Sequence, residues 1–210
     1  MIYPKNKLKS MLEEILRLDT ETFIYLNNLG NSSLDSFWIF LSRKEANIVV
    51  YLSGLLFYLK NKGFKSYKIR SSDVIYIFSL VLVMIVISDQ LANIFKDSFE
   101  RLRPCYNEII QDSVRLVKES CGGRYGFFSA HASNSFSLAV FFGLLFLDFS
   151  KYPIYFTLIY ASLISYSRIY LGVHYPLDII FGALVGVING LVIYKVHKII
   201  LENFNLFNKS

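Results

Sequence analysis

Long apolar runs, separated by short polar stretches, are the feature that most limits what this chain can fold into. A helix needs about 20 mostly apolar residues to cross a bilayer, and five runs approach that length. We predict membrane-spanning helices at residues 45–60, 73–95, 130–147, 154–169 and 176–196. Only 18% of the residues are charged, against about a quarter in soluble domains. The sequence therefore predicts an all-α, polytopic membrane bundle of five or six spans.

The segment before the first run has a different pattern. Residues 1–19 carry one apolar helical face, formed by Leu8, Met11, Leu12, Ile15 and Leu16. Such a helix is expected to lie at the membrane interface. Residues 20–44 are apolar but interrupted by polar residues at 27–33. We expect two short helices within one leaflet there, and a complete span kinked at Gly30 is the alternative.

Basic residues set the expected orientation in the membrane. Residues 60–70 contain five Lys or Arg and no acid, and loops of this kind stay in the cytoplasm. That orientation places residues 97–128 and the turn at Gly172 outside. The net charge of +6 fits basic cytoplasmic loops and anionic lipid, and nucleic acid is not an expected partner. The chain then divides into an N-terminal segment (1–44), a membrane core (45–201) and a cytoplasmic tail (202–210).

Cys105 and Cys121 are the only cysteines, and both fall in the predicted outer loop. Outside the cytoplasm, two such thiols are expected to form a disulfide. Closing a loop of about 16 residues would stabilise the fold by about 3 kcal/mol in the chain-entropy model. Two unpaired thiols are the alternative, and zinc is not expected because the loop contains no His.

The first of three candidate clusters lies at the outer end of the second predicted span. Lys96 and Arg103 are seven residues apart, so they share one face if the helix continues to Pro104. With Arg168 they would form a site for a group carrying about two negative charges. The alternative is a charged helix end with no ligand.

The second cluster comes just before the third predicted span. Ser129 is a good N-cap residue, and the free N–H groups of a first helical turn bind phosphate. His131, on that first turn, could protonate a departing oxygen. An ordinary N-cap followed by an interfacial His is the alternative.

The third cluster spans residues 167–178 and holds Arg168, His174 and Asp178 between two apolar runs. Pro176 suits the first turn of a helix, which would place Asp178 about one turn from His174. The carboxylate can then hold one ring nitrogen and aim the other outward, while Arg168 could bind an anion in a bidentate manner. A loop with one His and an Arg–Asp pair is the alternative.

Taken together, the clusters resemble the type 2 phosphatidic acid phosphatases, which share a core with vanadium haloperoxidases. That family pattern is Lys, six residues, Arg-Pro; then Pro-Ser-Gly-His; then Ser-Arg, five residues, His, three residues, Asp. The matching residues are Lys96, Arg103, Pro104, Ser129, His131, Ser167, Arg168, His174 and Asp178. The second motif departs at Phe128 and Ala130, which replace Pro and Gly, and Ala130 keeps its N–H available if its φ is helical. The resemblance covers about residues 73–196.

The resemblance implies an enzyme in which His174 attacks phosphorus and forms a phosphohistidine, while Asp178 holds the imidazole tautomer. His131 is implied to protonate the leaving oxygen and then to activate water. The implied phosphate-binding residues are Lys96, Arg103, Ser129, Ala130 and Arg168. No metal or cofactor is expected, because three fixed cations would neutralise the phosphoryl charge.

The implied substrate is a lipid phosphate or pyrophosphate whose tail stays in the bilayer. The implied location is a bacterial cytoplasmic membrane, with the site on its outer face. The candidates are undecaprenyl pyrophosphate, phosphatidylglycerol phosphate, phosphatidic acid and the phosphates of lipid A. A phosphotransferase with the same site, or a non-catalytic lipid-binding or transport protein, is the alternative. The oligomeric state is left open.

Three further positions bear on the site. Asp89 lies seven residues before Lys96, and an acid at membrane depth is expected to pair with a cation or to orient a neighbour. Residues 124–126 either contact the lipid head group or form a solvated loop. His197 is expected at a cytoplasmic helix end and is given no role.

Overall fold

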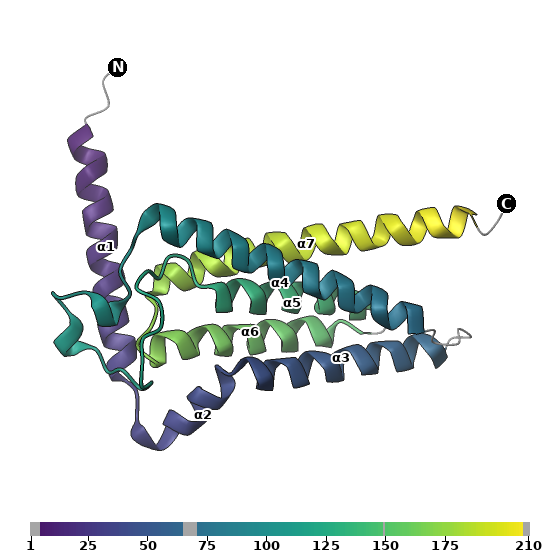
Figure 1. The fold of residues 1–210 in the computed structure, drawn as a ribbon, viewed down its shortest axis with the longest axis horizontal. Helices are drawn as coiled ribbons and strands as arrows, with labels where there is room; N and C mark the ends of the chain where they lie inside the picture. The colour runs from purple at the N-terminus through teal and green to yellow at the C-terminus, as the bar shows by residue number, and fades with distance from the viewer. Residues whose placement is uncertain (1–4, 65–70, 149, 208–210) are drawn as a thin grey trace.

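A computed structural model describes residues 5–64, 71–148 and 150–207, and these form a helical bundle (Figure 1). The helices are α1 (Lys5–Asn28), α2 (Asp35–Leu41), α3 (Lys44–Phe64), α4 (Ser71–Phe99), α5 (Ala130–Leu145), α6 (Tyr152–Tyr170) and α7 (Pro176–Phe207). Short 3₁₀ turns lie at Ser32–Leu34, Pro104–Tyr106, Gln111–Ser113 and Phe146–Asp148. Within the described residues the only β pairing is an isolated bridge between Leu102 and Tyr125. The all-helical prediction is therefore confirmed for this part of the chain.

Helices α3 to α7 run along one long axis, and α1 crosses one end of them (Figure 1). The α4–α5 connection, residues 100–129, lies at the same end as α1. α5 occupies the middle and packs against α3, α4, α6 and α7. Most of its residues are buried, as expected of a helix surrounded by other helices. The arrangement brings the start of α5, the end of α6 and the start of α7 together at one end.

α5 and α7 approach each other closely through a row of glycines. Gly182, Gly186 and Gly190 recur every fourth residue on one face of α7, and a Cβ at each would press on a backbone carbonyl of α5. Small residues at this spacing allow two helix backbones to come into contact in membrane proteins. Close packing along this face fixes the first turn of α7 relative to the first turn of α5.

Polar side chains link three helices inside the bundle. The Asn189 amide on α7 donates to the Met84 carbonyl at 2.9 Å and to the Ser88 hydroxyl at 3.0 Å, both on α4. The Ser133 hydroxyl on α5 bonds to the Ser88 hydroxyl at 3.0 Å. His197, expected at a helix end, is buried with its ring 3.1 Å from the Tyr76 hydroxyl.

Two helices of the described chain are long and apolar enough to cross a membrane, at Val74–Phe99 and Pro176–Asn203. Asn47–Leu56 and Ala130–Leu145 are shorter apolar helices. This fits a membrane protein, and the total of five or six spans stays a prediction. The basic stretch expected at 60–70 lies partly outside the described residues, because 65–70 are not among them.

The N-terminal segment differs from the expected division near residue 20. α1 is one continuous helix through Asn28, and α2 follows a short turn at which Asn31 accepts the Ser33 N–H. Asp19 and Asn27, the second of which belongs to the predicted polar interruption at 27–33, are buried on the same face as Phe23. The i, i+4 spacing of these three residues gives one face. They therefore mark a docking face, and the polar interruption predicted at 27–33 coincides with the end of α1 at Asn28.

Gly186→Ala is expected to lower thermal stability, because the added Cβ would meet the Ser133 carbonyl oxygen. Overpacking of this kind costs about 1–3 kcal/mol. The measurement is the unfolding midpoint of the purified protein in detergent. Gly54→Ala, on α3, is the matched control, because its Cβ would meet nothing within 4 Å. Equal midpoints for the two variants would contradict the close helix packing.

Candidate active site

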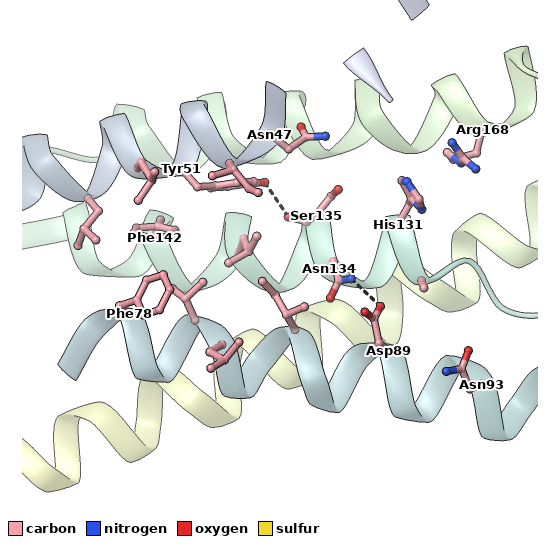
Figure 2. A pocket seen from close by; sticks show the side chains of 18 of the residues that line it. Asn47, Tyr51, Phe78, Asp89, Asn93, His131, Asn134, Ser135, Phe142 and Arg168 are labelled. Carbon is pink, nitrogen blue, oxygen red and sulfur yellow. Dashed lines mark hydrogen bonds between the residues drawn. The ribbon is translucent and has the colours of Figure 1, made fainter. Parts of the chain in front are cut away.

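A cavity of about 730 Å³ opens between α3, α4 and α5 and reaches the ends of the helices near α1. One end is polar and is lined by Lys96, Arg103, His131, Arg168 and His174. Most of the remaining lining is apolar, and it includes Leu52, Leu55, Phe78, Leu82, Leu138 and Phe142. Figure 2 shows His131 and Arg168 toward one end and Tyr51, Phe78 and Phe142 toward the other. The cavity thus joins a basic region to an apolar one.

His174 and Asp178 are paired as the sequence predicts. Pro176 begins α7, and the His174 Nδ1 lies 3.3 Å from the Asp178 Oδ2. The same carboxylate oxygen accepts the Tyr175 N–H at 3.0 Å. Asp178 is fully buried behind His174, so the carboxylate supports the ring from the side away from the cavity. With Nδ1 engaged, Nε2 is the nitrogen left for a substrate.

The surroundings of His174 favour the neutral imidazole. His174 lies in the α6–α7 connection, and burial lowers its pKa well below the ordinary value near 6.5. Arg103, Arg168 and Lys96 lower this pKa further, and a hydrogen bond to the Gly126 backbone acts in the opposite direction. A neutral imidazole carries the free lone pair that a nucleophile needs.

Arg103 reaches the cavity by a different route from the one predicted. α4 ends at Phe99, and Glu100 has a φ of +46°, so the helix does not continue to Pro104. Arg103 lies in extended backbone instead. Its N–H donates to the Arg124 carbonyl at 3.1 Å. The expectation that Lys96 and Arg103 share one helical face is therefore wrong, although both line the cavity.

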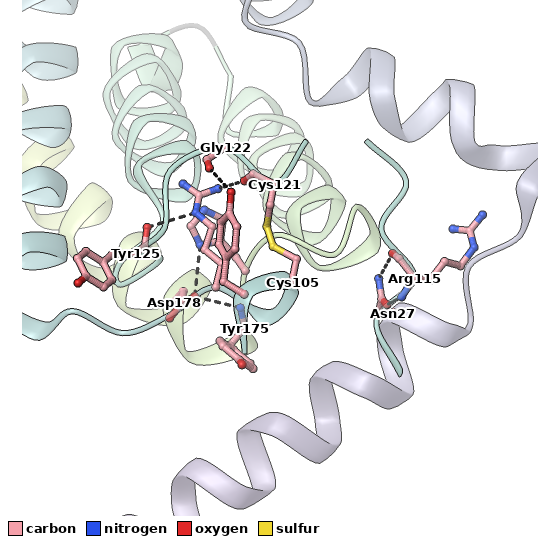
Figure 3. Close-up of a disulfide and its surroundings, with 11 residues drawn as sticks. Asn27, Cys105, Arg115, Cys121, Gly122, Tyr125, Tyr175 and Asp178 are labelled. Atoms are coloured by element: carbon pink, nitrogen blue, oxygen red, sulfur yellow. Dashed lines mark hydrogen bonds and ion pairs between the residues drawn. A yellow bond between two sulfur atoms is a disulfide. The ribbon is translucent and has the colours of Figure 1, made fainter. Parts of the chain in front are cut away.

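The α4–α5 connection fixes the Arg103 side chain through backbone carbonyls. Its Nη1 donates to the Cys121 oxygen at 2.8 Å, and its Nε donates to the Tyr125 oxygen at 3.2 Å (Figure 3). Cys105 and Cys121 are joined by a disulfide with a Cα–Cα distance of 6.4 Å. The crosslink therefore holds one of the two carbonyls that orient the guanidinium.

Arg168 is buried in the last turn of α6 and is also held by a neutral partner. Its Nη1 donates to the Ser42 hydroxyl, which follows α2. Its Nε is buried and has no hydrogen-bond partner within the described residues. A buried donor left in this state requires an explanation, and a bound anion at the polar end would supply one.

The first turn of α5 carries the second motif. Ser129 is the N-cap, and its hydroxyl accepts the Ala132 N–H at 3.4 Å. Ser129 is buried and does not line the cavity, whereas Ala130 and His131 do. Ala130 is the first residue of α5 and so has helical backbone. Phe128, in place of the Pro of the pattern, packs on Phe95 with ring centroids 5.3 Å apart.

Asp89 orients a neighbour, which was one of the two roles expected for it. The Asn134 Nδ2 donates to its Oδ1 at 2.9 Å (Figure 2). Both residues line the cavity. Arg124 is exposed, while Gly126 is buried against the His174–Asp178 pair. The Arg124 side chain therefore does not contact the site, although the backbone carbonyls of Arg124 and Tyr125 bind Arg103.

Sequence reasoning missed Arg101 and Asp19. Arg101 Nη1 donates to Asp178 Oδ1 at 2.8 Å, and its Nη2 donates to Asp19 Oδ2 at 2.5 Å. An extended segment places residues two apart on the same side, so the spacing of Arg101 and Arg103 was a usable signal. This spacing could be used only once α4 was known to end before Arg101. Nothing in the local sequence distinguishes Asp19 from other acids on α1.

These residues form a site suited to a phosphoryl group. Three cations surround a nucleophile-capable imidazole, and a second imidazole stands on the first turn of α5. Fixed positive charge stabilises the charge that spreads over phosphoryl oxygens during transfer. The apolar part of the cavity would accept a hydrocarbon chain attached to that phosphoryl group.

The family model described as the PAP2 superfamily matches residues 72–201. A lipid A 4'-phosphatase of Porphyromonas gingivalis is 35% identical over 89% of this chain and 75% of its own length. A lipid A 4'-phosphatase of Bacteroides thetaiotaomicron is 34% identical over 90% of this chain and 81% of its own length. An undecaprenyl-diphosphatase of Sulfolobus acidocaldarius is 29% identical over 78% of this chain and 80% of its own length.

Solved structures show the same fold. The crystal structure of Aquifex aeolicus LpxE has a TM-score of 0.59 and 25% sequence identity, over 83% of this chain and 93% of that one. A PAP2-type phosphatidylglycerolphosphate phosphatase of Bacillus subtilis has a TM-score of 0.66 and 17% identity, over 88% of this chain and 87% of that one. The second likeness concerns the fold alone.

Gly126→Ala is expected to reduce the turnover number by about ten-fold or more, because displacing reacting groups slightly is costly. The added Cβ would lie 3.1 Å from the Arg103 Cγ and 3.2 Å from the Asp178 Oδ2. The measurement is phosphate release from a lipid phosphate at saturating substrate. Gly123→Ala, in the same loop, is the control, because its Cβ would meet nothing within 4 Å. Equal turnover by both variants would show that the Gly126 contact is not needed.

Proposed function

The chain belongs to the PAP2 superfamily, and we propose that it hydrolyses a phosphate monoester on a lipid A-type glycolipid in the membrane. The observation that carries this proposal is the cavity itself, in which one end gathers three cations and two imidazoles and the rest is mostly apolar. A lipid phosphate has the same division into a dianionic head and an apolar tail. The lipid A 4'-phosphatases among the relatives favour this head group over the other candidates.

In the first proposed step, the His174 Nε2 lone pair attacks phosphorus and the bond from phosphorus to the lipid oxygen breaks. His131 gives its proton to that oxygen, so the lipid leaves as an alcohol. Asp178 holds the Nδ1 proton and balances the positive charge that develops on the ring. The product on the enzyme is a phosphohistidine.

In the second step, a water molecule attacks the phosphohistidine and the bond between phosphorus and Nε2 breaks. His131, now neutral, takes a proton from the water, which returns both imidazoles to their starting states. Lys96, Arg103 and Arg168 bind the phosphoryl oxygens in both steps. Backbone N–H groups at the start of α5, from Ala130 onward, add further donors.

Ser129 supports this site indirectly. Its hydroxyl caps α5 and its N–H donates to the Asp178 carbonyl at 3.0 Å. It thereby ties the first turn of α5 to the first turn of α7. We therefore assign Ser129 to positioning these two helices around the phosphoryl group.

The proposed activity is tested by phosphate release in detergent with EDTA present. We expect release from lipid A, because three fixed cations take the neutralising role that a metal has elsewhere. Mass spectrometry of the product identifies which phosphate is lost. Undecaprenyl pyrophosphate, phosphatidic acid and phosphatidylglycerol phosphate are the comparison substrates, and an added lipid alcohol reveals transfer to an acceptor.

His174→Ala is expected to lower the rate by about 10³-fold or more, because it removes the nucleophile. A pure lipid-binding protein would release no phosphate in either form. Release that needs an added metal, or that persists in His174→Ala, would overturn the proposed mechanism. If the protein prefers undecaprenyl pyrophosphate, the proposed mechanism stands and the proposed substrate is wrong.

A further inference from the structure

We propose that α1 supplies a positioning residue, Asp19, which acts on the nucleophile through Arg101 and Asp178. This inference rests on the proposed phosphatase function. α1 lies outside the residues that match the family model, which begin at residue 72. A carboxylate from the N-terminal segment would thus support the His174–Asp178 pair.

Arg101 is the link between α1 and the catalytic pair. One nitrogen of its guanidinium donates to Asp178 Oδ1 at 2.8 Å, and the other donates to Asp19 Oδ2 at 2.5 Å. The side chains of Asp178 and Asp19 are 0% and 2% exposed, while that of Arg101 is 19% exposed. A guanidinium held in a fork by two buried carboxylates has one preferred orientation.

Asp19 also holds the backbone that carries Asp178. Its Oδ1 accepts the Leu177 N–H at 2.8 Å, in the first turn of α7. Such N–H groups have no partner within their own helix and interact favourably with a carboxylate. Asp19 therefore contacts both the cation beside Asp178 and the helix turn from which Asp178 projects.

The docking of α1 does not depend on Asp19 alone. Phe23 is buried against Tyr175 with ring centroids 5.3 Å apart. The Asn27 amide donates to the carbonyls of Ile169 and Tyr170, each at 3.0 Å. Asn27 also accepts the Arg115 N–H at 2.8 Å (Figure 3). A substitution at Asp19 should therefore leave α1 in place.

The orientation of Arg101 explains why Asp19 would affect turnover. Asp178 must stay anionic to hold the Nδ1 proton of His174 and to stabilise the imidazolium that develops. Without the Asp19 charge, Arg101 keeps one carboxylate partner and gains freedom to turn toward water. Asp178 would then be less well fixed, and the loss would appear in the chemical step. Substrate binding uses the cations on the cavity side and should change little.

Asp19→Asn is the sharpest variant, because it keeps the side-chain volume and an acceptor for the Leu177 N–H. We expect the turnover number to fall by about ten-fold or more, with KM within about two-fold of the original. Glu21→Gln is the matched control on the same helix, where an exposed ion pair with Arg17 is lost. It should leave both parameters unchanged. Asp19→Asn turnover equal to that of Glu21→Gln would overturn the proposal.

A double variant tests whether Asp19 acts through Arg101. If it does, Asp19→Asn combined with Arg101→Gln should be no slower than Arg101→Gln alone, because both act on one chain of contacts. Multiplied losses in the double variant would contradict that route. The thermal unfolding midpoint of each variant is measured in parallel. A loss of turnover that is fully explained by unfolded protein would also contradict the proposed role of Asp19.

A readout independent of lipid turnover separates this inference from the proposed function. Diethyl pyrocarbonate modifies neutral imidazoles, and mass spectrometry reports the rate at His174. Asp19→Asn should lower this rate relative to Glu21→Gln, even if no tested lipid releases phosphate. In that case the assigned substrate is wrong and the positioning role stands. Equal rates in both variants would overturn the role itself.

Discussion

The chemistry of the site depends on how its buried cations are held. Arg103 donates to two backbone carbonyls of the α4–α5 connection, and Arg168 donates to a serine hydroxyl. Neutral partners leave the positive charge available to an anion. Arg115 shows the contrast, because both oxygens of the Asp35 carboxylate bind it, at 2.6 and 2.7 Å. Arg115 and Arg101 are thus paired with acids, whereas within the described residues neither Arg103 nor Arg168 forms an ion pair with an acid.

The same cations bear on the nucleophile. They disfavour a proton on His174, and burial acts in the same direction, so the imidazole is kept neutral where it faces the cavity. The helix packing makes this arrangement rigid. Glycines on α7 let it lie directly against α5, so the two helix starts that carry His131 and Asp178 have little freedom to move apart.

Much of this could be predicted from the sequence, because the motifs fall at helix ends where short-range rules apply. Proline at the first turn of α7 and serine at the cap of α5 set the local geometry that places His174, Asp178 and His131. The place of Arg103 was predicted for the wrong reason, since α4 ends at Phe99 and the loop turns back on itself. The contacts of the α4–α5 connection join residues far apart in the sequence, and no local sequence pattern predicts them.

The N-terminal helix shows a second limit. The polar residues at 27–33 predict an interruption, and α1 does end at Asn28, but Asn27 also shares a buried docking face with Asp19 and Phe23. Asp19 and Arg101 meet across 82 residues of sequence, and such a pairing needs the fold to be known. The apolar residues of the first part of α1 remain exposed, as an interfacial helix requires; they are Leu8, Met11, Leu12, Ile15 and Leu16.

The most direct test of the account is to look for phosphate on the enzyme during turnover. The protein is mixed rapidly with a radiolabelled lipid phosphate, quenched in alkali, in which phosphohistidine survives, and digested for mass spectrometry. The account predicts label on His174 within the first turnover, and none on any residue of His174→Ala. Phosphate release with no label on the protein, or with label on another residue, would contradict it.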